Sequence, residues 1–370
     1  MMKKFIINIL PVMLFCAIFC SCEKWTEVEA DNFETPERSA EYYANLRLWK
    51  ATAGDRQVSF GWFGGWNGEG ASMVGSLAGL PDSLDMVSIW GDWKTMTDAR
   101  QKDLKYVQQV KGTKVMATLF TQSVGQGITP DGVDLNEYWG WNPSATSQNA
   151  EPNDEQKVAI RKYAAAIADT ILSLGYDGLD IDFEGDGDLM RGQYRWKVFI
   201  EELGKYLGPK SGTGKLLALD FFGDYSMGNS VSKEIAPYFD WFINQAYAWQ
   251  VGSNYTVLNN RLGYIINSYA SEELTVADVA KKFIVTDSFE HGQTALNGGL
   301  PFTQEDGTTV LSYTVGMAAW EPLINGKRYA KGGSGVYHIE YGYTAAKEDG
   351  FYPFTRRNIQ IMNPASKKGN

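Results

Sequence analysis

The sequence predicts a single (β/α)8 barrel. From about residue 56 onward, short apolar runs rich in β-branched and aromatic residues alternate with longer stretches of helical periodicity, which is typical of βα units around a parallel sheet. No Pro-, Gly- or Ser-rich linker divides these runs, so one barrel accounts for all of them, with a doubly wound open sheet as the alternative. The eight expected strands are Val58–Trp62, Met86–Trp90, Lys114–Phe120, Gly178–Phe183, Leu216–Phe221, Trp241–Gln245, Phe283–Thr286 and Gly335–Ile339.

Helical patterns fill the intervals between these strands. The clearest helix spans Asp154–Leu174, with Asp154 as its N-cap and Gly175 at its end. A second spans Gln193–Leu207 and ends before Gly208 and Pro209, both of which interrupt helices.

Long loops follow the third and seventh strands, over residues 121–153 and 289–313. Barrel enzymes build their active sites at the carboxyl ends of the strands, so we expect these loops to govern substrate specificity. Residues 37–50 are expected to form a short helix outside the barrel.

The N-terminus has the residue pattern of a secretory signal peptide, because Lys3 and Lys4 precede an apolar run over Phe5–Phe19. A membrane anchor helix is the alternative, although the run is short for a bilayer. The cysteines that follow resemble a lipobox, which implies a signal peptide over residues 1–21 and a lipidated Cys22. Residues 22–50 would then be an acidic tether with the short helix, and residues 51–370 the barrel.

The acidic residues after Cys22 resemble the export signals of Bacteroidetes surface lipoproteins. That likeness implies a protein held by its lipid on the outer membrane or cell surface of a Gram-negative bacterium. We also expect a monomer.

Composition narrows the partners. The net charge is −10, and removing residues 1–21 leaves 32 basic against 44 acidic residues, a charge of −12. So acidic a surface repels phosphate backbones, which argues against nucleic-acid binding. The 12 Trp and 20 Tyr suit stacking on sugar rings, although most large aromatics are core. The three cysteines all precede residue 23 and only His291 and His338 exist, so we expect no disulfide, metal or cofactor.

One strand carries an unusual set of carboxylates. Side chains alternate along a strand, so Asp180, Asp182 and Glu184 point one way, and the intervening apolar residues point towards the helices. Three like charges inside a barrel cost several kcal/mol unless some are protonated or hydrogen-bonded. Such coupling raises one pKa, as a general acid at neutral pH requires.

Two other interpretations of this segment, a calcium loop and a solvated acidic turn, fit its residues less well. A calcium loop starting at Asp180 would need a bidentate Glu at its twelfth position, where Arg191 stands. A solvated acidic turn suits Asp186 and Asp188 but not the alternating carboxylates between Leu179 and Phe183.

The segment from Asp177 to Glu184 reads D-G-x-D-x-D-x-E and resembles the motif strand of glycoside hydrolase family 18. The likeness extends over roughly residues 55–365. It implies that Glu184 is the general acid and that Asp182 orients the substrate's 2-acetamido group, whose carbonyl oxygen attacks the anomeric carbon. It also implies that Asp180 tunes Asp182, while Asp177 shapes the start of the strand.

A second segment, Asn244-Gln245-Ala246-Tyr247, resembles the Gln-x-Tyr of the endo-β-N-acetylglucosaminidase branch. Tyr247 would donate a hydrogen bond to the acetamido oxygen, and Gln245 would hold the same sugar. Family 18 chitinases show Ser-x-Gly-Gly on the third strand and an inserted domain before the last strand. In this chain the third strand reads Val115-Met116-Ala117-Thr118-Leu119-Phe120, and fewer than fifty residues separate the last two strands. Both differences favour an endoglycosidase.

Further substrate contacts are expected from side chains on other strands. Segments Met317–Pro322 and Val336–Tyr341 look like those of Bacteroidetes members of the branch, although which of Tyr337, His338 or Glu340 faces the sugar stays open. The expected substrate-binding residues are Gln245, Trp62, Trp90, Asp220 and Tyr337.

These likenesses together imply a mannosyl-glycoprotein endo-β-N-acetylglucosaminidase. It would cleave the chitobiose core of N-glycans with retention, through an oxazolinium intermediate, and without a cofactor. The alternatives are a non-catalytic surface glycan-binding protein on the same barrel, and a chitinase.

Overall fold

The computed structural model describes residues 38–365, except residues 71, 224–228, 292–293 and 344–349. The compact unit that contains the barrel begins at Arg38. The expected signal peptide and Cys22 therefore lie outside the described residues. Within the described part of the chain, no helix is both long and apolar enough to cross a bilayer.

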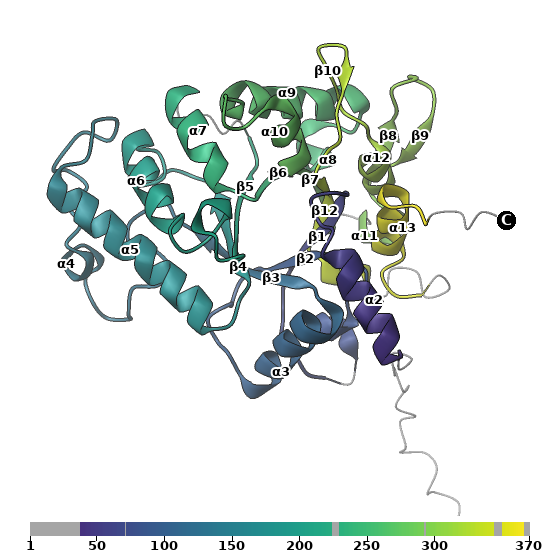
Figure 1. The fold of residues 1–370 in the computed structure, drawn as a ribbon, viewed down its shortest axis with the longest axis horizontal. Coiled ribbons are helices and arrows are strands. Elements are labelled where there is room, and N and C mark those ends of the chain that lie inside the picture. Colours follow the sequence, from purple (N-terminus) through teal and green to yellow (C-terminus); the bar gives the residue numbers. More distant parts are fainter. Residues whose placement is uncertain (1–37, 71, 224–228, 292–293, 344–349, 366–370) are drawn as a thin grey trace, which may run out of the picture. The chain divides into compact units, whose positions relative to one another are not determined.

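Eight parallel strands close into a barrel in the order β1-β12-β7-β6-β5-β4-β3-β2 (Figure 1). Since β1 pairs with both β2 and β12, the sheet has no open edge, so the doubly wound alternative is wrong and the barrel prediction is confirmed. The strands are β1 Val58–Phe63, β2 Met86–Ile89, β3 Lys114–Phe120, β4 Gly178–Phe183, β5 Leu216–Phe221, β6 Trp241–Gln245, β7 Phe283–Ser288 and β12 Gly333–Tyr337.

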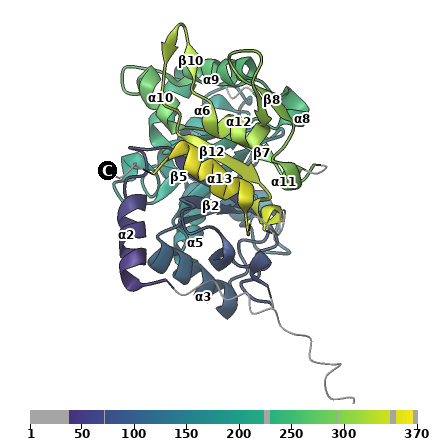
Figure 2. The same cartoon turned by 90° about the vertical axis from the view of Figure 1, so that its right-hand side faces the viewer.

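Helices cover the outside of the barrel (Figure 2). The α-helices are α2 Ala40–Lys50, α3 Asp98–Tyr106, α4 Leu135–Trp139, α5 Asp154–Ser173, α6 Gln193–Leu203, α7 Asn229–Ile235, α8 Ala248–Val251, α9 Tyr255–Tyr269, α10 Val276–Lys282, α11 Thr294–Asn297, α12 Tyr313–Ala319 and α13 Pro353–Met362. Short 3-10 helices span Met73–Gly75, Leu77–Gly79, Pro209–Ser211, Ala236–Tyr238 and Ile339–Gly342, and a π turn spans Val107–Lys111. Two hairpins pair β8 Pro301–Thr303 with β9 Val310–Ser312 and β10 Leu323–Ile324 with β11 Lys327–Arg328.

The last barrel strand differs most from its predicted bounds. It begins at Gly333 and ends at Tyr337, two residues before the predicted Ile339. The cause is His338, whose φ of 52° lies in the left-handed region and ends the extended backbone before the 3-10 helix Ile339–Gly342. Local propensity gives no sign of this backbone conformation in a histidine.

Two helix ends also differ from the predictions. Asn153, rather than Asp154, caps α5, because its side chain accepts from Gln156 N while the Gln156 side chain accepts from Asn153 N in a capping box. Helix α6 stops at Leu203, four residues before the predicted end. At the C-cap Gly204, a Cβ would lie 2.2 Å from the Tyr238 ring, so the close approach of that tyrosine requires glycine.

The strands separate two apolar regions. Side chains pointing outward, including Leu179 and Ile181, pack under the helices. The lower barrel interior is a smaller cluster that includes Phe60, Met116 and Ile243. On β4 the alternation is as predicted, since Asp180 and Asp182 lie on the opposite face from Leu179 and Ile181 and point into the upper interior.

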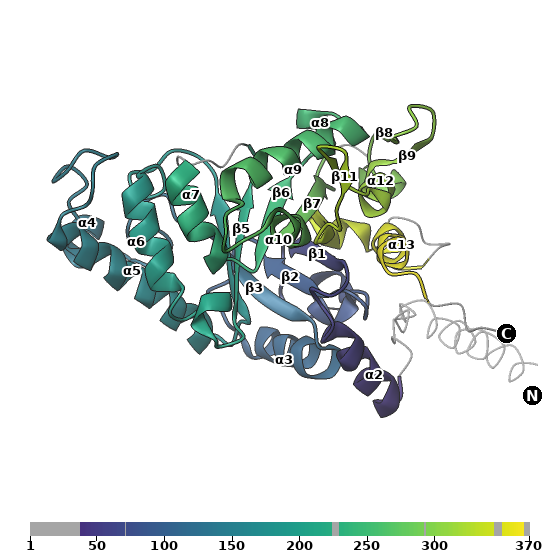
Figure 3. The same cartoon turned by 45° about the horizontal axis from the view of Figure 1, so that its top comes forward.

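Helix α2 lies outside the ring of strands, next to their amino-terminal ends (Figure 3). Arg47 Nη1 donates to Val110 O at 2.8 Å, and Lys50 Nζ donates to Thr113 Oγ1 at 2.7 Å, just before β3. This helix therefore occupies the end of the barrel remote from the carboxylates.

Candidate active site

A cavity of about 460 Å³ opens at the carboxyl ends of the strands. It receives side chains from β1, β4, β5, β6, β7 and β12 and from residues that follow β2, β4, β5, β6 and β7. Eight of the predicted site residues line it: Trp62, Trp90, Asp182, Glu184, Asp220, Gln245, Tyr247 and Tyr337. The ninth, Asp180, is fully buried beneath them.

Strand register brings the acidic groups together. Asp182 on β4 is the direct neighbour of Asp220 on β5, and Asp180 is flanked by Thr118 on β3 and Ala218 on β5. Since residues two apart on a strand share a face, Asp180 points into the barrel interior one level below the adjacent pair Asp182 and Asp220.

Asp180 is anchored by the neighbouring strands. Its Oδ2 accepts from Trp62 Nε1 at 2.8 Å and from Thr118 Oγ1 at 3.4 Å, and Thr118 in turn contacts Ser88 Oγ at 2.7 Å. Burial raises the pKa of Asp180 to about 6, and hydrogen bonding from neighbours such as Ser88 and Trp62 opposes that rise. Trp62, predicted to bind substrate, thus also holds the deepest carboxyl.

Asp220 and Asp182 are more strongly perturbed. Burial, followed by the charges of Asp182 and Asp180, raises the pKa of Asp220 well above its usual range. Burial, with the charges of Glu184 and Asp180, does the same to the pKa of Asp182. A hydrogen bond with Asp220 lowers the pKa of both other aspartates, so Asp220 fits the role of the protonated member.

The proton on Asp220 has a defined place. Asp220 Oδ1 accepts from Gln245 Nε2 at 2.7 Å, which leaves Oδ2 to carry the hydrogen. Asp220 Oδ2, Asp180 Oδ1 and Asp182 Oδ1 are all buried, and no other described residue supplies a donor to them. A proton on Asp220 Oδ2 would supply one donor to this group of oxygens and remove one of three buried charges.

Aromatic rings form one wall of the cavity. The Tyr337 ring lies 6.1 Å from that of Tyr247 in a stacked arrangement, and 6.2 Å from Trp62 and 5.6 Å from Trp90 edge-on. Burial raises the pKa of Tyr247 well above its usual range, so its phenol stays protonated and can donate. Among the candidates at the end of the last strand, Tyr337 faces the cavity.

His338 and Glu340 form a pair beside this wall. His338 Nδ1 lies 2.5 Å from Glu340 Oε1, and neither residue lines the cavity. A Cβ at Gly64 would lie 2.8 Å from Glu340 Oε1, so the pair packs tightly on the backbone after β1. Asp177 also lies elsewhere, where its Oδ2 accepts from Val115 N at 3.0 Å and from Gln108 Nε2 at 2.8 Å at the start of β4.

Sequence reasoning missed several residues at the cavity rim. Trp249, with 49% of its surface exposed, has its ring 4.2 Å from the imidazole of His291, and Arg191 and Glu290 stand nearby on the lining. Trp249 lies two residues beyond the Gln-x-Tyr segment, which is a signal that could have identified it. The others depend on loops that meet only in the folded chain. No cluster of three or more metal-ligating side chains occurs among the described residues.

Known protein families and solved structures resemble this chain. The family profile described as "Glycoside hydrolase family 18, BT1044-like" matches residues 21–361. The chain belongs to glycoside hydrolase family 18. Within family 18, it is 32% identical over 192 residues to endo-beta-N-acetylglucosaminidase F2 of Elizabethkingia meningoseptica. That match covers 49% of this chain and 48% of the other, so the chain spans about half the length of the curated relative it matches.

Solved family 18 structures resemble the whole barrel. A BT1044 structure superposes with a TM-score of 0.70 at 28% identity, covering 88% of this chain and 93% of that one. An endo-beta-N-acetylglucosaminidase from Cordyceps militaris, in complex with fucosyl-N-acetylglucosamine-Asn, has a TM-score of 0.58 at 22% identity, covering 89% and 97%. The second likeness shows the fold alone. The family predicted from the carboxylate strand is thus confirmed.

The buried carboxyls give a testable pH dependence of stability. A folded pKa near 6 for Asp180, against 3.8 unfolded, means that the folded state binds the proton more tightly. The resulting stabilisation is complete below pH 4 and is lost as pH rises through 6, at about 1.4 kcal/mol per pKa unit. We therefore expect Asp180→Asn to raise the free energy of unfolding at pH 7.5 by about 1–3 kcal/mol, with little change at pH 4.

Urea unfolding at both pH values measures this difference. The control is Asp186→Asn, since 97% of the Asp186 side chain is exposed and its neutralisation should alter neither value appreciably. An Asp180→Asn variant that is less stable than wild type at pH 7.5 would contradict this electrostatic description of the cluster.

Proposed function

We propose that this protein is an endo-β-N-acetylglucosaminidase that cleaves the chitobiose core of N-glycans. The observation that carries the proposal is the meeting of Asp182 and Glu184 with Gln245 and Tyr247 in one cavity, with Asp180 buried beneath them. The likeness to endo-beta-N-acetylglucosaminidase F2 supports the same activity.

In the proposed mechanism, Glu184 protonates the glycosidic oxygen. The substrate's acetamido oxygen attacks the anomeric carbon as the glycosidic bond breaks, and an oxazolinium forms. Asp182 accepts the acetamido N–H and stabilises the positive charge, while Tyr247 donates to the acetamido oxygen. Glu184 then takes a proton from water, which opens the oxazolinium and gives a product with retained configuration.

Asp220 has a positioning role in this scheme. Its proton lowers the negative charge beside Asp180 and Asp182, and its other oxygen accepts from the Gln245 amide at 2.7 Å. This arrangement leaves Asp182 able to turn towards the acetamido group without three adjacent anions forming. Asp220 also lines the cavity, so its expected contact with substrate stays a prediction beside this role.

Two rival functions remain to be separated. A surface glycan-binding protein would also use an aromatic wall, but it has no need for a buried carboxyl cluster that costs stability. A chitinase is disfavoured by strand β3, whose Val115–Phe120 differs from Ser-x-Gly-Gly, and by the short interval between β7 and β12.

The test is a panel of high-mannose, hybrid and complex N-glycoproteins with chitooligosaccharides alongside. We expect release of glycan from at least one glycoprotein, with one N-acetylglucosamine left on the asparagine. Cleavage of chitooligosaccharides alone would favour a chitinase, and affinity without release would favour a binder.

Tyr247→Phe should lower kcat about a hundredfold and alter KM less. The phenol hydrogen bond strengthens as charge develops on the acetamido oxygen, so its loss falls mainly on the transition state. Steady-state hydrolysis of an intact glycopeptide measures kcat and KM separately. The matched control is Tyr264→Phe, on the exposed side of α9. A Tyr247→Phe variant with wild-type kcat would contradict the proposed hydrogen bond from Tyr247 to the acetamido oxygen.

We also propose attachment to the outer membrane or cell surface through a lipid on Cys22. The lipobox-like sequence before that cysteine supports it. Metabolic labelling with a fatty acid in a Gram-negative host should mark the wild-type chain and not Cys22→Ser. Equal labelling of both would reject the assignment.

A further inference from the structure

A second cavity, of about 640 Å³, lies at the opposite end of the barrel and shares no residue with the active-site cavity. We call it the basal cavity. It is bounded by the end of α2 and by α10, and by residues at or just before the amino-terminal ends of β2, β3, β5 and β6. Its volume is in the range of small-molecule sites.

The charge of the basal cavity is opposite to that of the protein. Five basic side chains and three carboxylates line it, a net of two positive charges in a chain whose net charge is −10. The basic residues are Arg47, Lys50, Lys114, Lys281 and Lys282.

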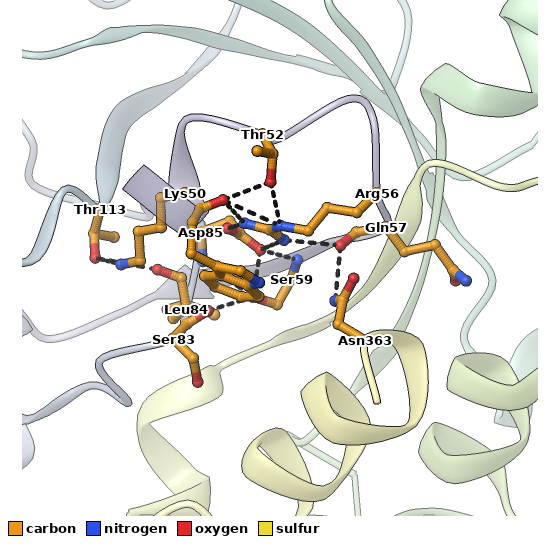
Figure 4. Close-up of polar contacts among 11 residues, drawn as sticks. Lys50, Thr52, Arg56, Gln57, Ser59, Ser83, Leu84, Asp85, Thr113 and Asn363 are labelled. Carbon is orange, nitrogen blue, oxygen red and sulfur yellow. Dashed lines mark hydrogen bonds and ion pairs between the residues drawn. The ribbon is translucent and has the colours of Figure 1, made fainter. Parts of the chain in front are cut away.

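The three carboxylates of the cavity are already engaged. Asp85 receives Arg56 at 2.6 and 3.1 Å and the backbone N–H of Ser59 at 2.9 Å (Figure 4). Asp278 closes the capping box of α10, and Asp240 accepts from Leu217 N at 2.9 Å. Arg56, which is not part of the lining, thus neutralises the carboxylate nearest to Lys50.

Three of the cations, the buried Lys50, the half-buried Lys282 and the exposed Arg47, have only neutral hydrogen-bond partners among the described residues. Lys50, 6% exposed, donates to Thr113 Oγ1, as Figure 4 shows, and Lys282 donates to Phe239 O at 2.5 Å. Arg47 donates to Val110 O. Each of these groups keeps further N–H donors, and an ammonium has three of them.

One other buried lysine has a carboxylate partner, whereas Lys331 bonds to two carbonyl oxygens. Lys111, 3% exposed, is paired with Asp82 at 2.9 Å and also donates to two carbonyls. Lys50 has one hydroxyl partner and an open cavity beside it. Burial lowers the pKa of Lys50 to about 7, and the charge of Asp85 opposes only part of that shift. An anion in the cavity would meet N–H donors of Lys50 for which no described residue supplies an acceptor.

We propose that the basal cavity binds a phosphate ester, with its oxyanion held by Arg47, Lys50 and Lys282. Three cations from two helices match a group with several charged oxygens better than a single carboxylate, and a guanidinium binds phosphate through two parallel N–H donors. The organic part of the ester lies against the apolar side chains Met86, Leu216 and Trp241, which also line the cavity.

This chemistry can come from a free metabolite or from a phospholipid headgroup. Titration calorimetry of the full chain with inorganic phosphate and with glycerol 3-phosphate tests the first source. Sedimentation with phosphatidylglycerol–phosphatidylcholine vesicles, against vesicles of phosphatidylcholine alone, tests the second. We expect saturable binding in one of these arms.

The decisive variant is Lys50→Met with Lys282→Met, which should weaken that binding at least about tenfold. The matched control is Lys102→Met with Lys105→Met, which removes the same charge from the exposed side of α3. Thermal unfolding checks the fold. If the buried double variant does not fold, Lys281→Glu, at an exposed position of the rim, should weaken binding several-fold.

The readout is binding, so it does not depend on the proposed hydrolase activity. The proposal is overturned if neither phosphate compounds nor anionic vesicles bind, or if the double variant binds as tightly as its control.

Discussion

Glu184→Gln is expected to lower the rate of glycan release about a hundredfold to ten-thousandfold, the usual contribution of a positioned general acid. Glutamine keeps the shape and hydrogen-bonding capacity of the side chain but cannot deliver a proton to the leaving oxygen. Glu184 directly follows the carboxyl end of β4 and is only partly buried, unlike Asp180, Asp182 and Asp220. The fold and the affinity for glycan should therefore persist in this variant.

Single-turnover release from a glycoprotein, measured with a binding assay on the same preparation, checks both parts. The control is Glu155→Gln, an exposed position on α5 remote from the cavity lining, which should match wild type. Loss of glycan binding together with turnover in Glu184→Gln would assign the residue to ground-state contacts instead.

Asp182→Asn should be nearly as damaging, with a loss of about a hundredfold or more, because the acetamido oxygen is then poorly held for attack. The defect should be specific to the first step. A sugar oxazoline supplied as substrate already contains the bond that Asp182 helps to form, so its hydrolysis should be impaired far less than that of the glycoside.

The comparison of the two substrates by the same variant measures this specificity. Glu184→Gln serves as the contrast, since Glu184 also activates water in the second step and should slow both reactions. Equal deficits of Asp182→Asn on glycoside and oxazoline would contradict the assignment of Asp182 to acetamido orientation.

Much of the barrel could be predicted because its strands repeat a local signal. Four strands, among them β4 and β5, have their predicted bounds, since each is a run of apolar or alternating residues that begins and ends at polar or glycine positions. The last strand was misplaced because its end depends on the left-handed backbone of His338, which no local pattern encodes.

The site was predictable where its residues share one strand and less so where strands meet. Asp180, Asp182 and Glu184 are visible together in the sequence. The link between Asp220 and Gln245 exists only because β5 and β6 are neighbours, so Asp220 could be placed near the site but not given its partner. Likewise, the contact of Trp249 with His291 joins helix α8 to the loop after β7, and the basal cavity joins helices far apart in the chain.

The measurement that tests the central claim most directly is the configuration of the first product. Proton NMR, recorded as glycan is released, follows the anomeric signal of its new reducing-end N-acetylglucosamine before mutarotation. Substrate-assisted hydrolysis retains configuration, so the β-anomer should appear first. Initial formation of the α-anomer, or no release from any N-glycoprotein, would contradict the account.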